Sequence, residues 1–158
     1  YQKILDYIDI AKSEGARLIA GGGPSDVGPQ FVQPTIFTDV DNAMRIAQEE
    51  VFGPVLSIIG FDDEDEAVRI GNDVIYGLAA GVWTQNMGRA HRMAKALKAG
   101  TIWVNTYRAV SYMMPFGGMK HSGLGRENGQ DAIKEYLEVK SVWMNTSDDA
   151  PGNPFIMR

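Results

Sequence analysis

Short apolar runs rich in β-branched residues alternate in this chain with segments of helical periodicity. Strands are expected at residues 17–21, 31–37, 54–61, 78–84, 101–105 and 138–144. Helices are expected from the first residues to near Gly15, after Asp63, after Asn86 and around residues 132–137. Strands separated by single helices pair mostly in parallel, so the pattern predicts an α/β fold: a layered, largely parallel sheet with flanking helices.

Particular residues refine this prediction. Asp63, with Glu66 three residues later, has the spacing of a capping box, and Asn86 is a good cap for the following helix. Pro34 lacks a backbone N–H and so restricts residues 31–37 to an edge strand or an irregular stretch. The buried face of the helix after Asn86 is expected to consist of Met87, Ala90, Met93, Ala94 and Leu97.

Composition excludes several classes of function. With 158 residues the chain fits one ordinary domain, and a net charge of −5 without a basic tract argues against nucleic-acid binding. No apolar run approaches the ~18 residues that span a membrane. His91 and His121 lack metal-ligand spacing and cysteine is absent, so no metal site, no disulfide framework and a cytoplasmic location are expected. The chain opens at Tyr1 and runs directly into helical periodicity, which hints at a cut inside a larger protein or at processing.

The run EEVFGP at residues 49–54 has the composition of a ligand-facing loop and stands just before an expected strand. Ligands gather at strand ends in α/β proteins. The Glu50 carboxylate could accept two hydrogen bonds from a diol such as that of a ribose, and Phe52 offers an apolar face to a flat ring. The same residues would also suit a solvated acidic turn with a core phenylalanine.

The run PFGGMKHSGLGRE at residues 115–127 is also rich in glycine. Gly123, Gly125 and Gly129 nearly match a dinucleotide-binding fingerprint, but one residue too many separates the last two and no strand immediately precedes them. These glycines therefore indicate a structural turn. Phe116, Arg126 and Glu127 remain candidate functional residues, and no serine, threonine or lysine stands in a recognisable nucleophile motif.

Taken in order, the runs KILDYIDIAKSEGARLIAGG, QPTIF, EEVFGPV, YGLAAGVWT, GTIWVN, PFGG-K-SG-GRE and EYLEVKSV form a specific set. The chain resembles the C-terminal third of an NAD(P)-dependent aldehyde dehydrogenase. The resemblance ends at Asn145. It implies that residues 1–136 are part of the catalytic domain, that residues 137–146 form an oligomerisation strand, and that residues 147–158 are a C-terminal arm.

The resemblance also implies roles for single residues. Glu50 would bind the nicotinamide-side ribose of NAD or NADP, and Phe52 would pack near the nicotinamide. Phe116 would line the aldehyde tunnel. Glu127 matches a glutamate implicated in an auxiliary proton path near the general base.

Residues 106–114 resemble the loop that varies with the aldehyde, and Tyr107, Arg108 and Val110 are its candidate substrate contacts. Arg108 could pair with a carboxylate on a semialdehyde, or it could bond to a neighbouring loop or point to solvent. Glu138 matches an interface glutamate that pairs with arginines, one of which matches Arg126. A homo-oligomer, dimer or tetramer, is therefore implied.

The chemistry of that family needs parts that this chain lacks. A cysteine thiolate attacks the aldehyde, hydride passes to the nicotinamide, and activated water releases the acid. The nucleophile, the oxyanion-hole asparagine, the general base and the Rossmann half lie upstream in the family. We therefore expect a piece of a dehydrogenase that is inactive alone. The alternative is a truncated, non-catalytic module that pairs with an intact subunit. The aldehyde and the choice between NAD and NADP stay open.

Overall fold

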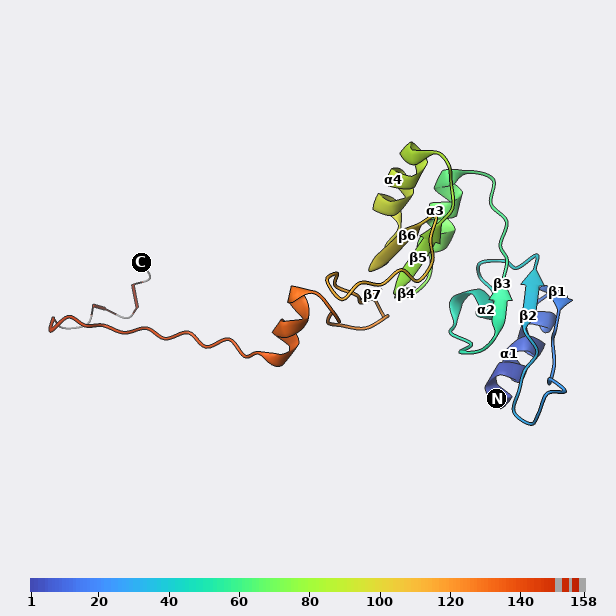
Figure 1. The fold of residues 1–158 in the computed structure, drawn as a ribbon, viewed down its shortest axis with the longest axis horizontal. Coiled ribbons are helices and arrows are strands. Elements are labelled where there is room, and N and C mark those ends of the chain that lie inside the picture. The colour runs from blue at the N-terminus through green and yellow to red at the C-terminus, as the bar shows by residue number, and fades with distance from the viewer. Residues whose placement is uncertain (150–151, 154, 157–158) are drawn as a thin grey trace.

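The computed structural model describes residues 1–149, 152–153 and 155–156, and it shows two lobes followed by a tail (Figure 1). The first lobe, residues 1–59, contains α1 (Gln2–Ser13), β1 (Arg17–Ala20), β2 (Thr35–Thr38), α2 (Arg45–Gln48) and β3 (Val55–Ser57). The second lobe, residues 62–129, contains α3 (Glu64–Asn72), β4 (Tyr76–Gly77), β5 (Ala79–Val82), α4 (Met87–Ala96), β6 (Thr101–Val104) and β7 (Met119–Lys120).

The first lobe has a hydrophobic core of its own. Its sheet has the order β1–β2–β3, with β1 antiparallel to β2 and β2 parallel to β3. Ile8 and Ala11, one helical turn apart on α1, are fully buried together with Phe37 of β2. The complete buried cluster consists of Ile8, Ala11, Ala16, Phe37, Val40 and Ile46.

The second lobe is a thinner layer. Its helices begin where their caps predict, because Asp63 accepts from the Glu66 N–H (2.8 Å) and Asn86 accepts from the Arg89 N–H (3.0 Å). Strand β5 pairs in parallel with β6, and β4 pairs antiparallel with β7. Among the described hydrophobic residues of this lobe, only Val82 and Ala90 are buried.

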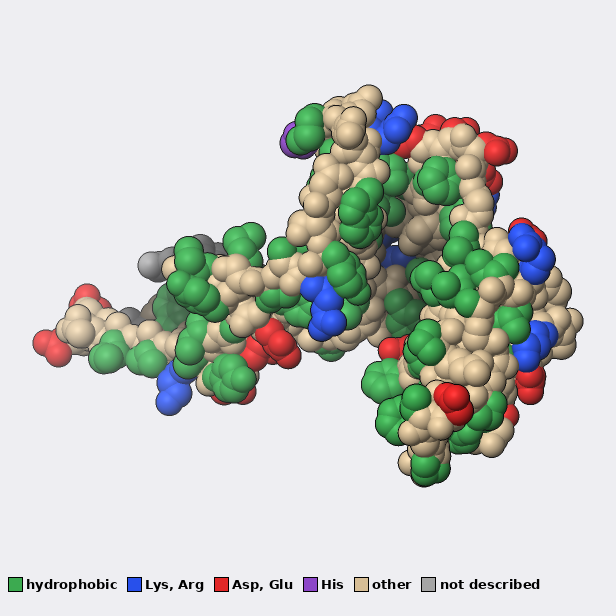
Figure 2. Space-filling view, turned by 45° about the vertical axis from the view of Figure 1, so that its right-hand side comes forward, with side chains coloured by type: hydrophobic (Ala, Val, Ile, Leu, Met, Phe, Trp, Pro, Cys, Tyr) green, Lys and Arg blue, Asp and Glu red, His purple; other side chains and the backbone are tan. Residues whose placement is uncertain are grey.

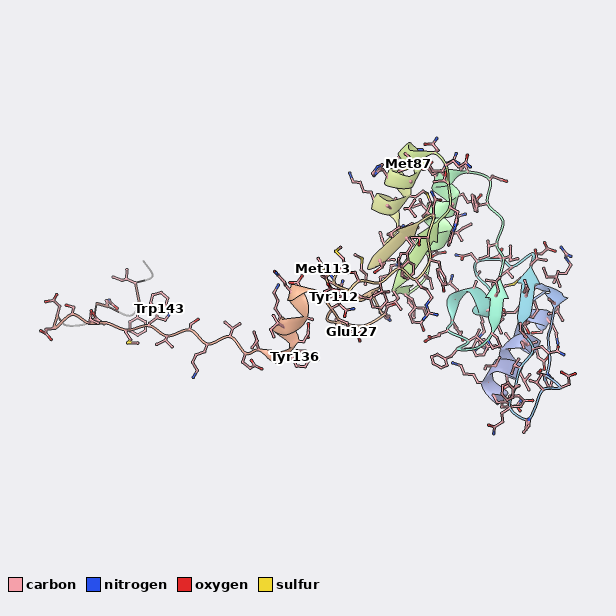
Figure 3. All side chains as sticks on the ribbon, in the orientation of Figure 1. Met87, Tyr112, Met113, Glu127, Tyr136 and Trp143 are labelled. Atoms are coloured by element: carbon pink, nitrogen blue, oxygen red, sulfur yellow. The ribbon has the colours of Figure 1, made fainter. Side chains whose placement is uncertain are left out.

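The predicted α/β class is confirmed, with three differences in detail. Parallel pairing joins β2 to β3 and β5 to β6, whereas the other two pairs are antiparallel and the strands form three small sheets. Of the two alternatives for residues 31–37, the edge strand was wrong, because β2 is the central strand of its sheet. Residues 31–34 are outside the strand and irregular, and Pro34 is tolerated because it precedes the first paired residue. Met87 was wrongly assigned to the buried face. It is 61% exposed at the outer end of α4 (Figure 3).

The chain leaves the second lobe through η1 (Gln130–Tyr136), a 3₁₀ helix where a helix around residues 132–137 was expected. Beyond it the tail is extended and exposed, and Val139 and Trp143 are 96% and 95% accessible. Within the described part of the tail no strand pairing forms, so the oligomerisation strand at residues 137–146 stays a prediction. Of the arm at residues 147–158, positions 150–151, 154 and 157–158 lie outside the described residues.

Much apolar surface faces solvent. The accessible surface is 12161 Å² for a mass of 17.3 kDa, whereas a compact monomer of that mass would expose about 7,800 Å². Hydrophobic side chains appear over both lobes and the tail in Figure 2. None of the helices in the described residues is both long and apolar enough to cross a bilayer.

Candidate functional site

The EEVFGP loop connects α2 to β3 and presents two of the predicted site residues to solvent. The Glu50 carboxylate is exposed, and Phe52 is 83% exposed. Phe52 also has a φ of +58°, in the left-handed region that bulky residues seldom adopt. The alternative of a core phenylalanine is therefore wrong for this residue. An exposed aromatic ring on a strained backbone is typical of a ligand-contacting position.

Helix α1 holds this loop from one side. The Lys3 ammonium donates to the Glu50 carbonyl oxygen (2.9 Å). Ile4 fills the space beside Gly53, where an added Cβ would lie 2.7 Å from its side chain. Gly53 is thus required by close packing between the loop and the first turn of α1.

A polar cluster lies where the loop begins. Arg45 donates through Nε and Nη2 to the two Glu49 carboxylate oxygens (2.9 Å each), and the Tyr7 hydroxyl donates to Oε2 of the same carboxylate (2.5 Å). Hydrogen bonds from Arg45 and then Tyr7 lower the pKa of Glu49 from 4.5 to about 2. The hydrogen bond to Glu49 raises the pKa of Tyr7 above 10.0.

In the second lobe, two predicted site residues are paired directly through their backbones. The Phe116 N–H donates to the Glu127 carbonyl (2.7 Å), and the Glu127 N–H donates to the Phe116 carbonyl (2.8 Å). Arg126 lies inside the glycine-rich turn that this pair closes, where its guanidinium donates to the carbonyls of Gly118 (2.9 Å) and Gly125 (2.7 Å). Backbone hydrogen bonds between Phe116 and Glu127 therefore close the predicted structural turn, and the Arg126 side chain stabilises it from inside.

A cavity of about 460 Å³ lies beside Phe116 and is lined mainly by apolar residues, including Trp103, Val110 and Met114. Tyr107 packs edge-on against Trp103, with ring centres 5.6 Å apart. Arg108 is exposed and does not line this cavity.

The loop of residues 106–114 closes onto the segment that carries Glu127. The Gly129 N–H donates to the Tyr112 carbonyl (2.9 Å), which joins the two segments at their backbones. Figure 3 shows Tyr112, Met113 and Glu127 at the same end of the second lobe.

Polar contacts at the end of α3 join the first lobe to the second and hold the glycine-rich turn within the second lobe. Gln48, just before the EEVFGP loop, donates to the Asp73 carbonyl (2.7 Å). The Lys120 ammonium, from the glycine-rich turn, donates to the carbonyls of Asn72 and Val74 (2.9 Å each). A second cavity of about 500 Å³ lies between the lobes, and Glu50 and His121 are among its lining residues.

The structure thus brings the predicted residues into separate groups. Glu50 and Phe52 stand together on the first lobe, while Phe116, Val110 and Glu127 share the second lobe. Glu138 lies in the exposed tail and forms no ion pair with Arg126 among the described residues.

Sequence reasoning missed the cluster around Glu49. Its one local signal was the four-residue spacing of Arg45 and Glu49, which places both side chains on one side of a helical turn. Tyr7 lies 42 residues away in sequence from Glu49, and no periodicity connects them.

Comparison with known proteins decides the family. The model of the aldehyde dehydrogenase family matches residues 1–142. This chain belongs to the aldehyde dehydrogenase family. The recognition drawn from the ordered motifs is confirmed.

Named relatives agree with this assignment. The chain is 49% identical over 154 residues to a betaine aldehyde dehydrogenase of Agrobacterium fabrum, covering 95% of this chain and 31% of that protein. A mutant of the P. syringae indole-3-acetaldehyde dehydrogenase, solved with NAD+ and IAA, superposes with a TM-score of 0.86 and 51% identity, over 90% of this chain and 29% of that one. An apo betaine aldehyde dehydrogenase mutant of Staphylococcus aureus gives a TM-score of 0.90 at 43% identity, over 99% and 32%. The aldehyde dehydrogenase segment described here therefore spans about a third of the length of its relatives.

Proposed function

We propose that this chain is part of an aldehyde dehydrogenase that oxidises an aldehyde to a carboxylic acid with NAD+ or NADP+, and that it forms one wall of the nicotinamide site and one wall of the substrate tunnel. One observation carries the proposal: Glu50 and Phe52 are both exposed on one loop that is held from α1, in a chain of this family. The P. syringae relative, solved in complex with NAD+, supports the cofactor.

The exposed side chains fit the nicotinamide half of such a cofactor. The Glu50 carboxylate has acceptor capacity for the two hydroxyls of a ribose, and the Phe52 ring offers a flat apolar face. When bound, the nicotinamide accepts a hydride. The chain contains no cysteine, so the thiolate nucleophile comes from outside it, and the chain alone should not reduce NAD+ with any aldehyde.

The second lobe supplies the substrate wall. The cavity beside Phe116 favours an apolar group on the aldehyde, with Tyr107 and Val110 on the loop that borders it. Arg108 faces solvent, so Arg108→Ala should change the preference between acidic and neutral aldehydes by less than about twofold. Glu127 is exposed next to Phe116 and serves the auxiliary proton path.

The tail supplies the subunit contact of a homo-oligomer. Its exposed apolar residues include Val139 and Trp143, and an extended segment can add to the sheet of a partner. Glu138, which starts this segment, would pair with arginines of the assembly, and Arg126 is one candidate.

A chimera tests the proposal. Residues 1–149 would replace the matching segment of the P. syringae indole-3-acetaldehyde dehydrogenase, and aldehyde-dependent NAD+ reduction would be followed. We expect an active enzyme in which Glu50→Gln raises the KM for NAD+ by about tenfold, because a charge-assisted hydrogen bond is lost. Asp65→Asn, the same chemical change on the exposed face of α3, is the matched control. A folded chimera with unchanged KM in Glu50→Gln would contradict the role of Glu50.

A second candidate is a non-catalytic assembly module, which the exposed apolar tail favours. Such a module would join an intact aldehyde dehydrogenase subunit. Size-exclusion chromatography of the 158-residue chain with the A. fabrum relative, with and without Trp143→Ser, separates the two candidates. A mixed oligomer that depends on Trp143 would support the module.

A further inference from the structure

Two adjacent carboxylates at the start of the EEVFGP loop have different surroundings. Both oxygens of Glu49 accept hydrogen bonds, from the Arg45 guanidinium and from the Tyr7 hydroxyl. The Glu50 carboxylate accepts none among the described residues, and Glu50 is held only through its backbone carbonyl by Lys3. The Glu49 carboxylate is thus occupied by hydrogen bonds within the protein, whereas the Glu50 carboxylate is available to a ligand.

We propose that Tyr7, Arg45 and Glu49 form a clamp that positions Glu50 and Phe52 for the cofactor. The clamp is defined by these three side chains and follows from the contacts alone, while its effect on the cofactor rests on the proposed function. All three act through the loop, so they are positioning residues.

The geometry explains how the clamp works. Glu49 is the residue that follows α2, with an extended backbone (φ −114°, ψ 149°), so its orientation sets the path of the chain into Glu50. A bidentate guanidinium–carboxylate pair fixes the plane of both groups, which a single hydrogen bond would not.

Tyr7 then connects this pair to another element. It comes from the second turn of α1, whose buried face packs into the first-lobe core through Ile8 and Ala11. The Arg45 guanidinium also lies 5.4 Å from the centre of the Tyr7 ring. The clamp therefore transmits the rigidity of the core to a loop that has few backbone hydrogen bonds of its own.

Electrostatics agree with this role. Arg45 and Tyr7 lower the pKa of Glu49, so its carboxylate stays ionised throughout the neutral range and the pair persists. Lys3 stands 5.5 Å from the Tyr7 ring centre, and its ammonium adds positive charge on the same side. The Glu14 carboxylate accepts from the Arg45 N–H (2.9 Å) and fixes the start of α2.

The clamp itself can be tested in the 158-residue chain by amide hydrogen exchange of residues 45–55. Tyr7→Phe removes only the hydroxyl, and Arg45→Lys keeps the charge but loses the bidentate geometry. We expect exchange in this segment to be about three- to tenfold faster in both variants, as the loss of an exposed charged contact allows. Tyr112→Phe, on a side chain 82% exposed in the second lobe, is the matched control and should change nothing there. Equal exchange in wild type, Tyr7→Phe and Arg45→Lys would overturn the clamp.

The effect on the cofactor is tested in the chimera. Tyr7→Phe should raise the KM for NAD+ about three- to tenfold, while the KM for the aldehyde stays within about twofold. A general loss of structure would instead lower kcat and the melting temperature with both KM values altered together, and that result would overturn a positioning role. If Glu50→Gln leaves the KM for NAD+ unchanged, the proposed function fails, while faster exchange at residues 45–55 would still support the clamp.

Discussion

In the proposed function the two lobes form two walls of one site, but they are built differently. The first lobe surrounds Phe37 and Ile8 completely, so the EEVFGP loop stands on a core made within the chain. In the second lobe Val82 and Ala90 are the buried hydrophobic residues among those described, and Trp83 on the adjoining strand end is 65% exposed. Phe116 and its cavity therefore lie on a layer whose outer side is exposed to solvent.

This difference shows which lobe is self-supporting. Burial of apolar surface is the main stabilising term in folding, so the first lobe has its own source of stability. The second lobe depends more on pairing between β5 and β6 and on the Glu64–Arg92 pair (2.7 Å). We expect the first lobe to tolerate isolation better than the second.

The largest expected effect comes from the first-lobe core. Phe37→Ala should destabilise the first lobe by about 3–5 kcal/mol, because it empties the centre of a packed core. Val82→Ala removes fewer carbon atoms from the thinner second lobe and should cost about 1.5 kcal/mol. Urea denaturation followed by amide exchange in each lobe measures both. A cost for Val82→Ala as large as that for Phe37→Ala would contradict the thinner packing of the second lobe.

A smaller effect is expected within the second lobe, where the glycine-rich turn contacts the end of α3. Lys120→Met keeps the length of the side chain but removes its hydrogen bonds to the carbonyls of Asn72 and Val74. Each net hydrogen bond is worth about 1 kcal/mol, so the pairing of β7 with β4 should loosen. Faster exchange of the His121 amide, which donates to Ile75 (2.9 Å), reports this loosening. Lys95→Met, on the exposed surface of α4, is the control.

The smallest effect concerns pH and the clamp. Glu49 has a folded pKa of about 2 against an ordinary 4.5, so its contribution is present above 4.5 and is lost as the pH falls through about 2. A ¹³C-NMR titration of the Glu49 carboxyl should show this low midpoint, with Arg45 as its main cause and Tyr7 as the second. In Arg45→Met the midpoint should rise toward 4.5. A midpoint unchanged by that substitution would contradict the assignment.

Local signals were enough to predict α1, α3 and α4, whereas the short α2 was not predicted. Asp63 and Asn86 mark helix starts because a capping side chain contacts an N–H only three residues away. Glycine spacing likewise excluded a phosphate loop, and residues 116 and 127 prove to be the base of a pinned turn.

Interactions between distant residues could not be predicted from one sequence. The contact from Tyr7 to Glu49 joins two elements whose relative orientation is set by the first-lobe core. The exposure of Met87 depends on whether another layer covers the outer end of α4, and helical periodicity gives no information about such a layer. Recognition of the family succeeded because it used the order of many motifs at once.

The left-handed backbone and the exposed ring of Phe52 determine how this position should respond to selection. A left-handed backbone costs a non-glycine residue about 1–2 kcal/mol, and a ring that is 83% exposed recovers little of it by burial. Glycine or asparagine would adopt the same backbone conformation at a lower conformational energy. A library of the active chimera sorted for thermal stability alone should therefore lose Phe52. The same library sorted for turnover should retain it, because the proposed cofactor contact needs the ring.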